Sequence, residues 1–290
     1  MNAIEISGLC KQFKGKKMTR VDALKSLDLQ VGQGEVFGFL GPNGAGKSTT
    51  IKILMGLLKA SSGTAQVLGV DSSMTDARLH VGFLPENPAF YDYLSAEEYV
   101  MFVGSQFKME SSLLARRTEE VLKRLDLWEA RKRPMRGYSK GMVQRVGLAQ
   151  TLVHDPDVYI LDEPMSGLDP IGRALVKEII LDLKKRGKCV FFSTHITDDV
   201  EKVCDRVGVI YKGELKKVDQ VDSIITAGIT GYILQVRKKD DSVEEIRVDK
   251  TELSKTLEEI SNRGDEIRLI EPKRKNLEDF FLEIVRSSEC

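Results

Sequence analysis

The ten residues from Gly41 to Thr50, GPNGAGKSTT, hold three glycines, a proline, a lysine and three hydroxyl residues. Their spacing matches G-x-x-x-x-G-K-[ST]. The run VFGFL before them reads as a buried strand, and after them the apolar residues recur at helical spacing at Ile51, Leu54, Met55 and Leu58. In a strand–loop–helix context, small residues let backbone N–H groups close around a phosphate chain, which the helix dipole also favours. The stretch therefore predicts a nucleoside triphosphate site.

Each residue type in this loop has an expected task. Lys47 is expected to reach the β- and γ-phosphates, and the Ser48 hydroxyl is expected to ligate Mg²⁺. The residues predicted to contact the nucleotide here are Gly41, Pro42, Asn43, Gly44, Ala45, Gly46, Lys47, Ser48 and Thr49. The predicted cofactors are thus ATP and Mg²⁺.

A second apolar run, in DVYILDEP, ends in the acids Asp162 and Glu163. Parallel sheets bind ligands at the carboxyl ends of their strands, so both acids are expected beside the loop. Asp162 is predicted to bind Mg²⁺ through water, and Glu163 to polarise the attacking water. A third run, CVFFST, ends at His195, which is expected to contact the γ-phosphate or to orient Glu163. Glu163, His195 and Lys47 are the predicted catalytic residues.

Composition limits the remaining possibilities. The chain has 290 residues with 44 basic and 44 acidic side chains, so no net basic charge points to nucleic acid. Four cysteines, Cys10, Cys189, Cys204 and Cys290, lack metal-site spacing and are expected to be reduced thiols. The longest uncharged stretch, residues 223–236, is too short to span a bilayer. The chain itself is expected not to cross a membrane, which leaves open a role against one.

Between the loop and the acids lies YSKGMVQR, residues 138–145. With the other motifs it resembles the signature of ATP-binding cassette (ABC) ATPases, usually Leu-Ser-Gly-Gly-Gln. Ser139 and Gly141 remain, and the resemblance assigns them to the γ-phosphate. Tyr138, Lys140 and Met142 depart from the usual residues, in a variant similar to cassettes that serve bacterial export-type permeases.

The resemblance covers roughly residues 4–217 and implies the fold. It is an α/β P-loop NTPase core: a mostly parallel sheet flanked by helices, an N-terminal antiparallel β part and an inserted helical subdomain at about residues 88–152. The cassette is expected over residues 1–217. Residues 218–290, where the periodicity changes, are expected to form a small α+β appendage whose role stays open among dimer contact, regulation and stability.

The residues also predict local features. In the insertion, Ser95 and Glu98 fit a capping box, and one helical stripe holds Leu113, Leu114, Val121, Leu122 and Leu125. Lys212 and Gly213 are the expected turn of a hairpin, and Asn276 is the expected cap of a helix near the end of the chain.

Further residues take roles from the same resemblance. MSGLDP resembles the D-loop, with Asp169 as its acid, and Phe13 stands where an aromatic ring lies under adenine; the alternative for Phe13 is a core aromatic. Glu86 occupies the place of the usual Q-loop glutamine and is a candidate Mg²⁺ ligand, against the alternative of a solvated loop acid. The aromatic segment PAFYDYLSAEEY is either subdomain core or a docking groove for a membrane partner.

The resemblance implies an ATPase subunit that drives a separate permease from the cytoplasmic face of the inner or plasma membrane. It implies a head-to-tail dimer, either homodimer or heterodimer, in which Ser139 and Gly141 of one subunit cap ATP on the other. Two other classes remain open: a cassette ATPase acting on ribosomes or DNA, and a regulatory module that binds ATP without hydrolysing it. The cargo is not readable from the sequence, since the permease chooses it.

Overall fold

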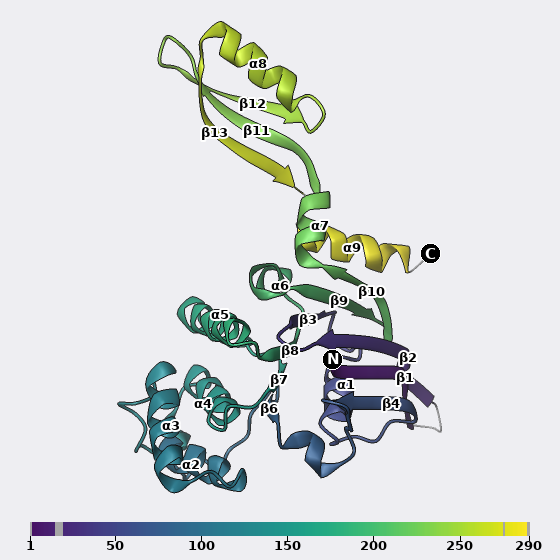
Figure 1. The fold of residues 1–290 in the computed structure, drawn as a ribbon, viewed down its shortest axis with the longest axis vertical. Coiled ribbons are helices and arrows are strands. Elements are labelled where there is room, and N and C mark those ends of the chain that lie inside the picture. Colours follow the sequence, from purple (N-terminus) through teal and green to yellow (C-terminus); the bar gives the residue numbers. More distant parts are fainter. Residues whose placement is uncertain (1, 15–19, 275, 289–290) are drawn as a thin grey trace. The chain divides into compact units, whose positions relative to one another are not determined.

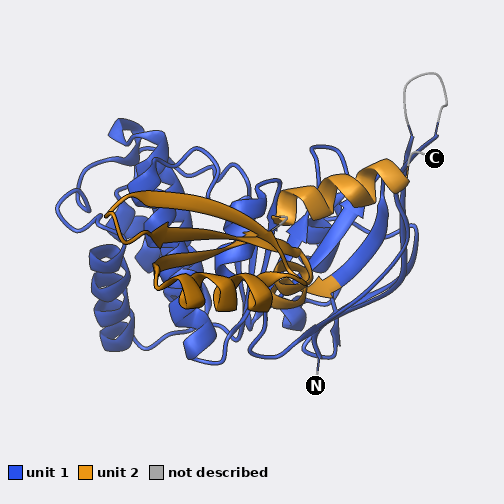
Figure 2. Cartoon of the chain, turned by 90° about the horizontal axis from the view of Figure 1, so that it is seen from above, with its two compact units in different colours: residues 1–218 blue, residues 219–290 orange. Residues whose placement is uncertain are grey.

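The computed structural model describes residues 2–14, 20–274 and 276–288. The chain divides into two compact units, Met1–Val218 and Asp219–Cys290, coloured separately in Figure 2. Each unit has its own sheet, so each is described by itself.

The centre of the first unit is a six-stranded sheet in the order β10-β9-β3-β8-β7-β6 (Figure 1). Its members are β3 (Val36–Leu40), β6 (Val81–Leu84), β7 (Val158–Asp162), β8 (Cys189–Thr194), β9 (Arg206–Tyr211) and β10 (Glu214–Gln220). Strand β3 runs parallel to β8 and β9, and β7 runs parallel to β6 and β8. Every residue of β3, β7 and β8 is buried, as expected for parallel strands covered on both faces. Their carboxyl ends meet at one edge.

An antiparallel sheet packs on one side of this centre, as the N-terminal β part predicts. It contains β1 (Asn2–Lys14), β2 (Arg20–Gly32), β4 (Ser62–Val67) and β5 (Val70–Asp71) in the order β2-β1-β4-β5. Helix α1 (Lys47–Leu54) contributes Ile51 and Leu54 to a core shared with Phe37 and Phe191. The sequence pattern extended this helix to Leu58, which is wrong: Gly56 turns the chain with φ 63°, although Leu58 still packs against the core.

The inserted segment forms three helices, α2 (Ala96–Gln106), α3 (Ser111–Arg124) and α4 (Lys140–Leu152), which lie together in Figure 1. Ser95 and Glu98 make the predicted capping box at the start of α2. Leu114, Val121 and Leu122 of α3 are buried, as the helical stripe predicts. Leu113 was expected on the same stripe but is exposed, because the buried face of α3 turns away from it.

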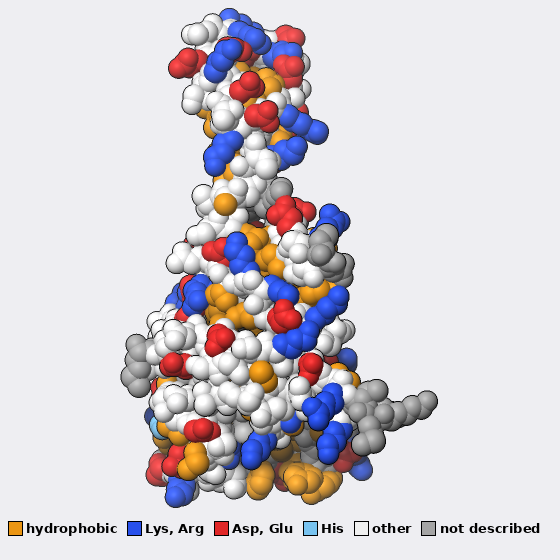
Figure 3. Space-filling view, turned by 90° about the vertical axis from the view of Figure 1, so that its right-hand side faces the viewer, with side chains coloured by type: hydrophobic (Ala, Val, Ile, Leu, Met, Phe, Trp, Pro, Cys, Tyr) orange, Lys and Arg blue, Asp and Glu red, His pale blue; other side chains and the backbone are white. Residues whose placement is uncertain are grey.

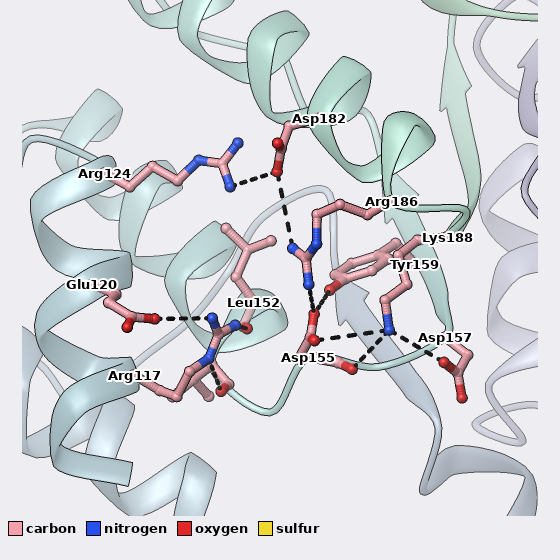
Figure 4. Close-up of polar contacts among 11 residues, drawn as sticks. Arg117, Glu120, Arg124, Leu152, Asp155, Asp157, Tyr159, Asp182, Arg186 and Lys188 are labelled. Atoms are coloured by element: carbon pink, nitrogen blue, oxygen red, sulfur yellow. Dashed lines mark hydrogen bonds and ion pairs between the residues drawn. The ribbon is translucent and has the colours of Figure 1, made fainter. Parts of the chain in front are cut away.

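A polar network joins this helical insertion to the parallel core (Figure 4). Arg124 of α3 donates to Asp182 of α5 (Pro170–Lys185) at 2.9 Å. Arg117 Nη2 donates to the carbonyl oxygen of Leu152 at 2.8 Å, where the carbonyls at the end of α4 lack helical partners. The Arg124 bond joins α3 to α5, and the Arg117 bond anchors the carboxyl end of α4, whose other end carries Ser139 and Gly141.

The remaining helices of the first unit lie against the parallel sheet. Helix α5 contacts β8, and α6 (Thr197–Val203) contacts both β3 and β8. The hairpin β9–β10 turns at Lys212 and Gly213, whose φ values of 48° and 82° fit a tight turn of left-handed residues. That turn is the one the sequence predicts.

The second unit contains a three-stranded antiparallel sheet in the order β12-β11-β13. Its elements are α7 (Val221–Ala227), β11 (Ile229–Arg237), β12 (Val243–Asp249), α8 (Leu253–Arg263), β13 (Glu266–Arg274) and α9 (Leu277–Ser287). Helix α8 packs against all three strands and closes a small core around Leu234, Val236, Val248 and Ile260. Asn276 caps α9 as predicted, while α7 is a helix that the sequence pattern did not indicate.

Three of the four cysteines lie in the described part of the chain, and all three are free thiols. Burial raises the pKa of Cys189 to about 12 and that of Cys204 well above its usual value, so both thiols stay protonated. Cys290 lies outside the described residues. Within the described residues, no helix has the length and apolar character needed to cross a membrane.

Candidate functional site

The glycine loop connects β3 to α1 at the carboxyl edge of the parallel sheet. Its backbone is shaped by glycines: Gly44 has φ 78° and Gly46 has φ 116°, values that other residues rarely adopt. A Cβ atom at Gly46 would lie 2.8 Å from the carbonyl oxygen of Ala23, so the loop must pass close to β2 there. The first turn of α1 contains no acidic residue, which leaves its positive dipole end available to an anion.

The loop forms one wall of a cavity of about 280 Å³. Its lining residues are Ala23, Pro42, Asn43, Gly44, Gly46, Lys47, Ser48, Thr49, Glu86 and Glu163. Lys47 Nζ donates to the carbonyl oxygens of Gly41 at 2.7 Å and Pro42 at 3.3 Å. The predicted loop residues other than Gly41 and Ala45 therefore share one cavity with Glu163, which is far from them in sequence.

Glu163 follows β7 and lies at the centre of the charged groups. Its φ of 50° is a left-handed value that glutamate adopts at a cost, as strained residues at functional sites do. Oε1 of Glu163 lies 3.2 Å from Lys47 Nζ, and the two side chains are only 8% and 5% exposed. Oε1 has this charged neighbour but accepts no hydrogen bond among the described residues, so part of its acceptor capacity is unused. A buried acceptor of this kind fits a water or cation held beside it.

His195 stands at the end of β8, next to Glu163. Its Nδ1 lies 3.0 Å from Oε2 of Glu163, and its side chain is 47% exposed. An Nδ1–H proton donated to the carboxylate would leave Nε2 directed elsewhere. The histidine can therefore orient Glu163 while its ring remains open to the solvent side.

Ser193 ties the two acids to the sheet, and the sequence interpretation did not single it out. Its hydroxyl accepts from the backbone N–H of Glu163 at 3.0 Å and donates to Oδ1 of Asp162 at 2.5 Å. All three residues are buried. The signal that could have found Ser193 is its pairing with Asp162 across parallel strands β7 and β8, which requires the strand register.

Three predicted nucleotide-binding residues lie elsewhere in the unit: Ser139, Gly141 and Asp169 are not among the residues lining the cavity. Ser139 caps α4 by accepting from the N–H of Met142, and Asp169 caps α5 by accepting from the N–H of Gly172 at 2.7 Å. A Cβ atom at Gly141 would meet only Leu168, at 3.7 Å. The start of α4 is thus an uncrowded helix N-terminus whose groups do not reach the loop of the same chain.

Phe13 also lies away from the cavity wall. It pairs with Val21 between β1 and β2, is 40% exposed, and has Lys11 Nζ 5.1 Å from the centre of its ring. The alternative that Phe13 is a core aromatic is therefore wrong. Its stacking role stays a prediction, and Ala23 is the β2 residue that the structure places in the wall.

The segment after β6 has two kinds of aromatic residue: some pack in the helical insertion, as the first alternative predicts, and others are exposed, while docking of a membrane partner stays a prediction. Phe90 packs on Tyr99 with ring centres 4.6 Å apart, and the Tyr99 hydroxyl donates to Gln150 of α4 at 2.7 Å. Tyr91 and Tyr93 contact each other but are 59% and 66% exposed. Glu86 precedes them and lines the cavity, so one segment leads from the cavity to an exposed aromatic surface.

Comparisons with known proteins agree with this geometry. A family model described as "ABC transporter" matches residues 24–166. The protein sll0415 of Synechocystis, an uncharacterized ABC transporter ATP-binding protein, is 50% identical over 68% of this chain, which spans 56% of that protein's length. YxlF of Bacillus subtilis, with the same description, is 35% identical over 98% of this chain and 100% of its own length. A solved ATP-binding subunit of an ABC transporter superposes with TM-score 0.70 at 28% identity, over 77% of this chain and 91% of its own.

Proposed function

Because the chain belongs to the family of ABC transporter ATP-binding proteins, we propose that it binds and hydrolyses ATP to drive a separate membrane-spanning permease. The observation that carries the proposal is Glu163, a buried carboxylate held between Lys47 and His195 at the wall of the glycine-loop cavity. A protein that only binds ATP needs the loop but has no need of a base at this position. The arrangement therefore favours a hydrolase over a regulatory module.

Three side chains of this chain divide the work of hydrolysis. Glu163 accepts the proton of the attacking water, since its Oε1 accepts no hydrogen bond among the described residues. His195 holds the other carboxylate oxygen and positions the base. Lys47 exchanges its carbonyl partners for phosphate oxygens and stabilises their negative charge.

The oxygen donors at the cavity are of the kind that suits a magnesium ion. The Ser48 hydroxyl and the Glu86 carboxylate line the cavity, whereas the buried Asp162 carboxylate is not part of its lining and adjoins it in sequence through Glu163; all three are hard oxygen ligands of the kind Mg²⁺ prefers. When bound, the ion neutralises charge on the phosphate oxygens. Ser193 keeps one oxygen of Asp162 occupied and thereby fixes the direction of the other.

The hydrolysing unit in this proposal is a head-to-tail dimer. Ser139, Gly141 and Asp169 do not line the cavity of their own chain, which supports a role on the cavity of a second chain. The N-terminus of α4 offers backbone N–H groups and positive dipole to an anion, and Ser139 starts this helix. The second chain is another copy or a related cassette.

Replacement of Glu163 by Gln tests the chemistry. The variant keeps the size of the side chain but removes the base, so ATP turnover falls by about 100-fold or more while ATP binding persists. Turnover is measured as phosphate release, and binding by equilibrium dialysis with labelled ATP. Glu178→Gln changes an exposed carboxyl of α5 and serves as the matched control with wild-type turnover. Hydrolysis by Glu163→Gln near the wild-type rate would remove Glu163 from this role.

The permease is the proposed partner, reached from the cytoplasmic face of the membrane. Tyr91 and Tyr93 support this contact because exposed aromatic side chains are enriched at interfaces. They follow Glu86 in sequence, so a partner bound to them would lie on the segment that lines the cavity. The export direction rests on the signature variant at residues 138–142.

Co-purification tests the partner. Tagged Glu163→Gln protein, made in its native host and solubilised with detergent in ATP, is expected to bring down a multi-span protein in stoichiometric amount. The same protein with Tyr91→Ala and Tyr93→Ala is expected to lose that protein but still bind ATP. Recovery with ribosomes instead would favour the cassette class that acts there. Acidic and basic side chains are interspersed on the face shown in Figure 3, a distribution unlike the basic patch of nucleic-acid-binding proteins.

A further inference from the structure

Strand β12 of the second unit leaves one of its edges without a partner among the described strands. It pairs with β11 on the other side, and the register runs without a shift from Gly231↔Asp249 to Arg237↔Val243. Its seven residues, VEEIRVD, contain no proline, glycine or lysine. A regular free edge presents a row of backbone N–H and C=O groups and is a template for pairing with another strand.

The opposite edge of the same sheet differs. Strand β13 contains Pro272, which has no N–H to donate, followed by Lys273, and its register with β11 shifts between Gln235 and Val236. Proline, lysine and irregular register are features by which proteins discourage edge pairing. The two edges of one small sheet are therefore not equivalent, and β12 is the open one.

The backbone direction of β12 follows from the bonds at its two ends. Lys238 N–H donates to the carbonyl oxygen of Ser242 at 2.8 Å, and Lys250 N–H donates to that of Thr230 at 3.3 Å. Because hydrogen-bonded positions alternate along an antiparallel pair, the even-numbered residues of β12 direct their backbone groups to β11. The odd-numbered residues, among them Glu245 and Arg247, direct theirs to the free edge.

Side-chain charge selects one register for a strand on that edge. Glu245 and Arg247 form an ion pair at 3.2 Å on the sheet face away from α8, and they are 50% and 73% exposed. Consider two β12 strands paired antiparallel with Ile246 on the twofold axis between them. Glu245 of each strand then lies directly opposite Arg247 of the other, and these are hydrogen-bonded positions. If the twofold axis passed through Glu245 instead, the two copies of Glu245 would lie opposite each other. If it passed through Arg247, the two copies of Arg247 would lie opposite each other. Opposite charges directly across strands stabilise a pair, and like charges destabilise it.

We propose that the free edge of β12 pairs with the same edge of a second copy of this chain, with Ile246 on the twofold axis. The two three-stranded sheets then join into one continuous antiparallel sheet. The contact is isologous: Glu245 of each copy meets Arg247 of the other. It needs no nucleotide, so it holds two chains together independently of the ATP-dependent cassette contact proposed above.

The first test is the oligomeric state of the full-length chain without nucleotide, measured by sedimentation velocity across a concentration series. The wild type is expected to be a dimer. Arg247→Glu places glutamate opposite glutamate twice and is expected to weaken the dimer by at least about tenfold. The double swap Glu245→Arg with Arg247→Glu exchanges the two charges and is expected to restore it. Arg268→Glu makes the same charge change at an exposed position of β13 and is expected to leave the dimer intact.

A cross-linking test measures the register itself. Antiparallel residues that face each other at a non-hydrogen-bonded position have Cα atoms about 4.5 Å apart, within the range of a disulfide. Ile246→Cys is therefore expected to form a disulfide-linked dimer under mild oxidation. In the control variant Val243→Cys, position 243 lies opposite Asp249 of the second copy, so no cross-link is expected. The wild type, which has only its own cysteines, is also expected to stay uncross-linked.

Three outcomes would overturn the inference. They are a monomeric wild type without nucleotide, a dimer that Arg247→Glu leaves unchanged, and a charge swap that fails to restore the dimer although the protein is folded. A chain that dimerises only when ATP is added would overturn the β12 contact while supporting the proposed cassette dimer. Hydrolysis by Glu163→Gln near the wild-type rate, together with a persistent nucleotide-free dimer, would overturn the proposed role of Glu163 while supporting the β12 contact.

Discussion

Two sheets of this chain, one from each unit, differ in where they place charged side chains. The six-stranded, mostly parallel sheet of the first unit is covered on both faces and brings Lys47, Asp162 and Glu163 together, buried, at its carboxyl edge. The three-stranded sheet of the second unit is covered by α8 on one face and carries Glu245 and Arg247 exposed on the other. Buried charges interact strongly and suit chemistry, whereas exposed charges interact weakly and suit the choice of a partner.

The difference is visible in two ion pairs of nearly equal length. Lys47–Glu163 and Arg247–Glu245 both measure 3.2 Å. The first pair is removed from water, so loss of one partner leaves a buried charge uncompensated. The second is solvated and contributes little to its own unit. Distance alone therefore does not tell a reactive pair from a surface pair; burial does.

The largest expected effect concerns the small core of the second unit. Leu234→Ala removes a fully buried side chain from a core of four buried residues and is expected to destabilise that unit by about 3–5 kcal/mol. Calorimetry of the full chain should show one transition lowered and the cassette transition unchanged. A uniform shift of all unfolding transitions would show that the two units unfold together, which would contradict the description of their sheets as independent.

A smaller effect is expected in the glycine loop. Gly46→Ala puts a Cβ atom 2.8 Å from a backbone carbonyl at φ 116°, and is expected to cost about 2–4 kcal/mol of stability. Gly44→Ala is its matched control, because nothing lies within 4 Å of that Cβ position. Only backbone strain of about 1–2 kcal/mol remains there. Chemical denaturation of both variants tests this, and equal losses would contradict the close approach to β2.

Lys47→Ala tests the buried ion pair. It removes the amine that is expected to contact phosphate, and ATP affinity is expected to fall about 10- to 100-fold, as for loss of a hydrogen bond to a charged group. Equilibrium dialysis with labelled ATP measures the change. Lys177→Ala, in an ion pair with Asp198 outside the cavity, is the control that keeps its affinity. An unchanged affinity in Lys47→Ala would contradict the assigned role.

The smallest effect is a pH dependence of the cassette. Burial lowers the pKa of His154 to about 4 from about 6.5, and its ring stacks on Phe107 at 3.6 Å. The folded state therefore favours the neutral ring, so stability is fully present above pH 6.5 and falls as the pH drops toward 4. The loss is expected to reach about 1–2 kcal/mol by pH 5.

His154→Gln checks this prediction. The variant removes the titrating group, so the free energy of unfolding should depend less on pH between 4 and 6.5 than in the wild type. Denaturant titrations at several pH values measure the slope. A slope equal to that of the wild type would assign the pH dependence to other groups.

Local sequence patterns were sufficient wherever the interactions are short in sequence. The capping box at Ser95, the helix cap at Asn276 and the turn at Lys212 involve neighbours within a few residues, and each appears as predicted. Errors occur where apolar periodicity alone was followed. Helix α1 stops at Leu54 rather than Leu58 because the chain turns at Gly56, and Leu113 is exposed because the buried face of α3 turns away from it.

The motifs in the sequence therefore determine that this chain holds a phosphate loop, two acids and a histidine at strand ends, because each motif is a local arrangement of backbone and side chain. Their convergence is a property of the folded sheet: register across β7 and β8 places Ser193 against Asp162 and directs Glu163 toward Lys47 and His195. The open edge of β12 is likewise invisible in the sequence. Which strand of a sheet is left unpaired depends on how all its strands associate, and that requires contacts between residues far apart in the chain.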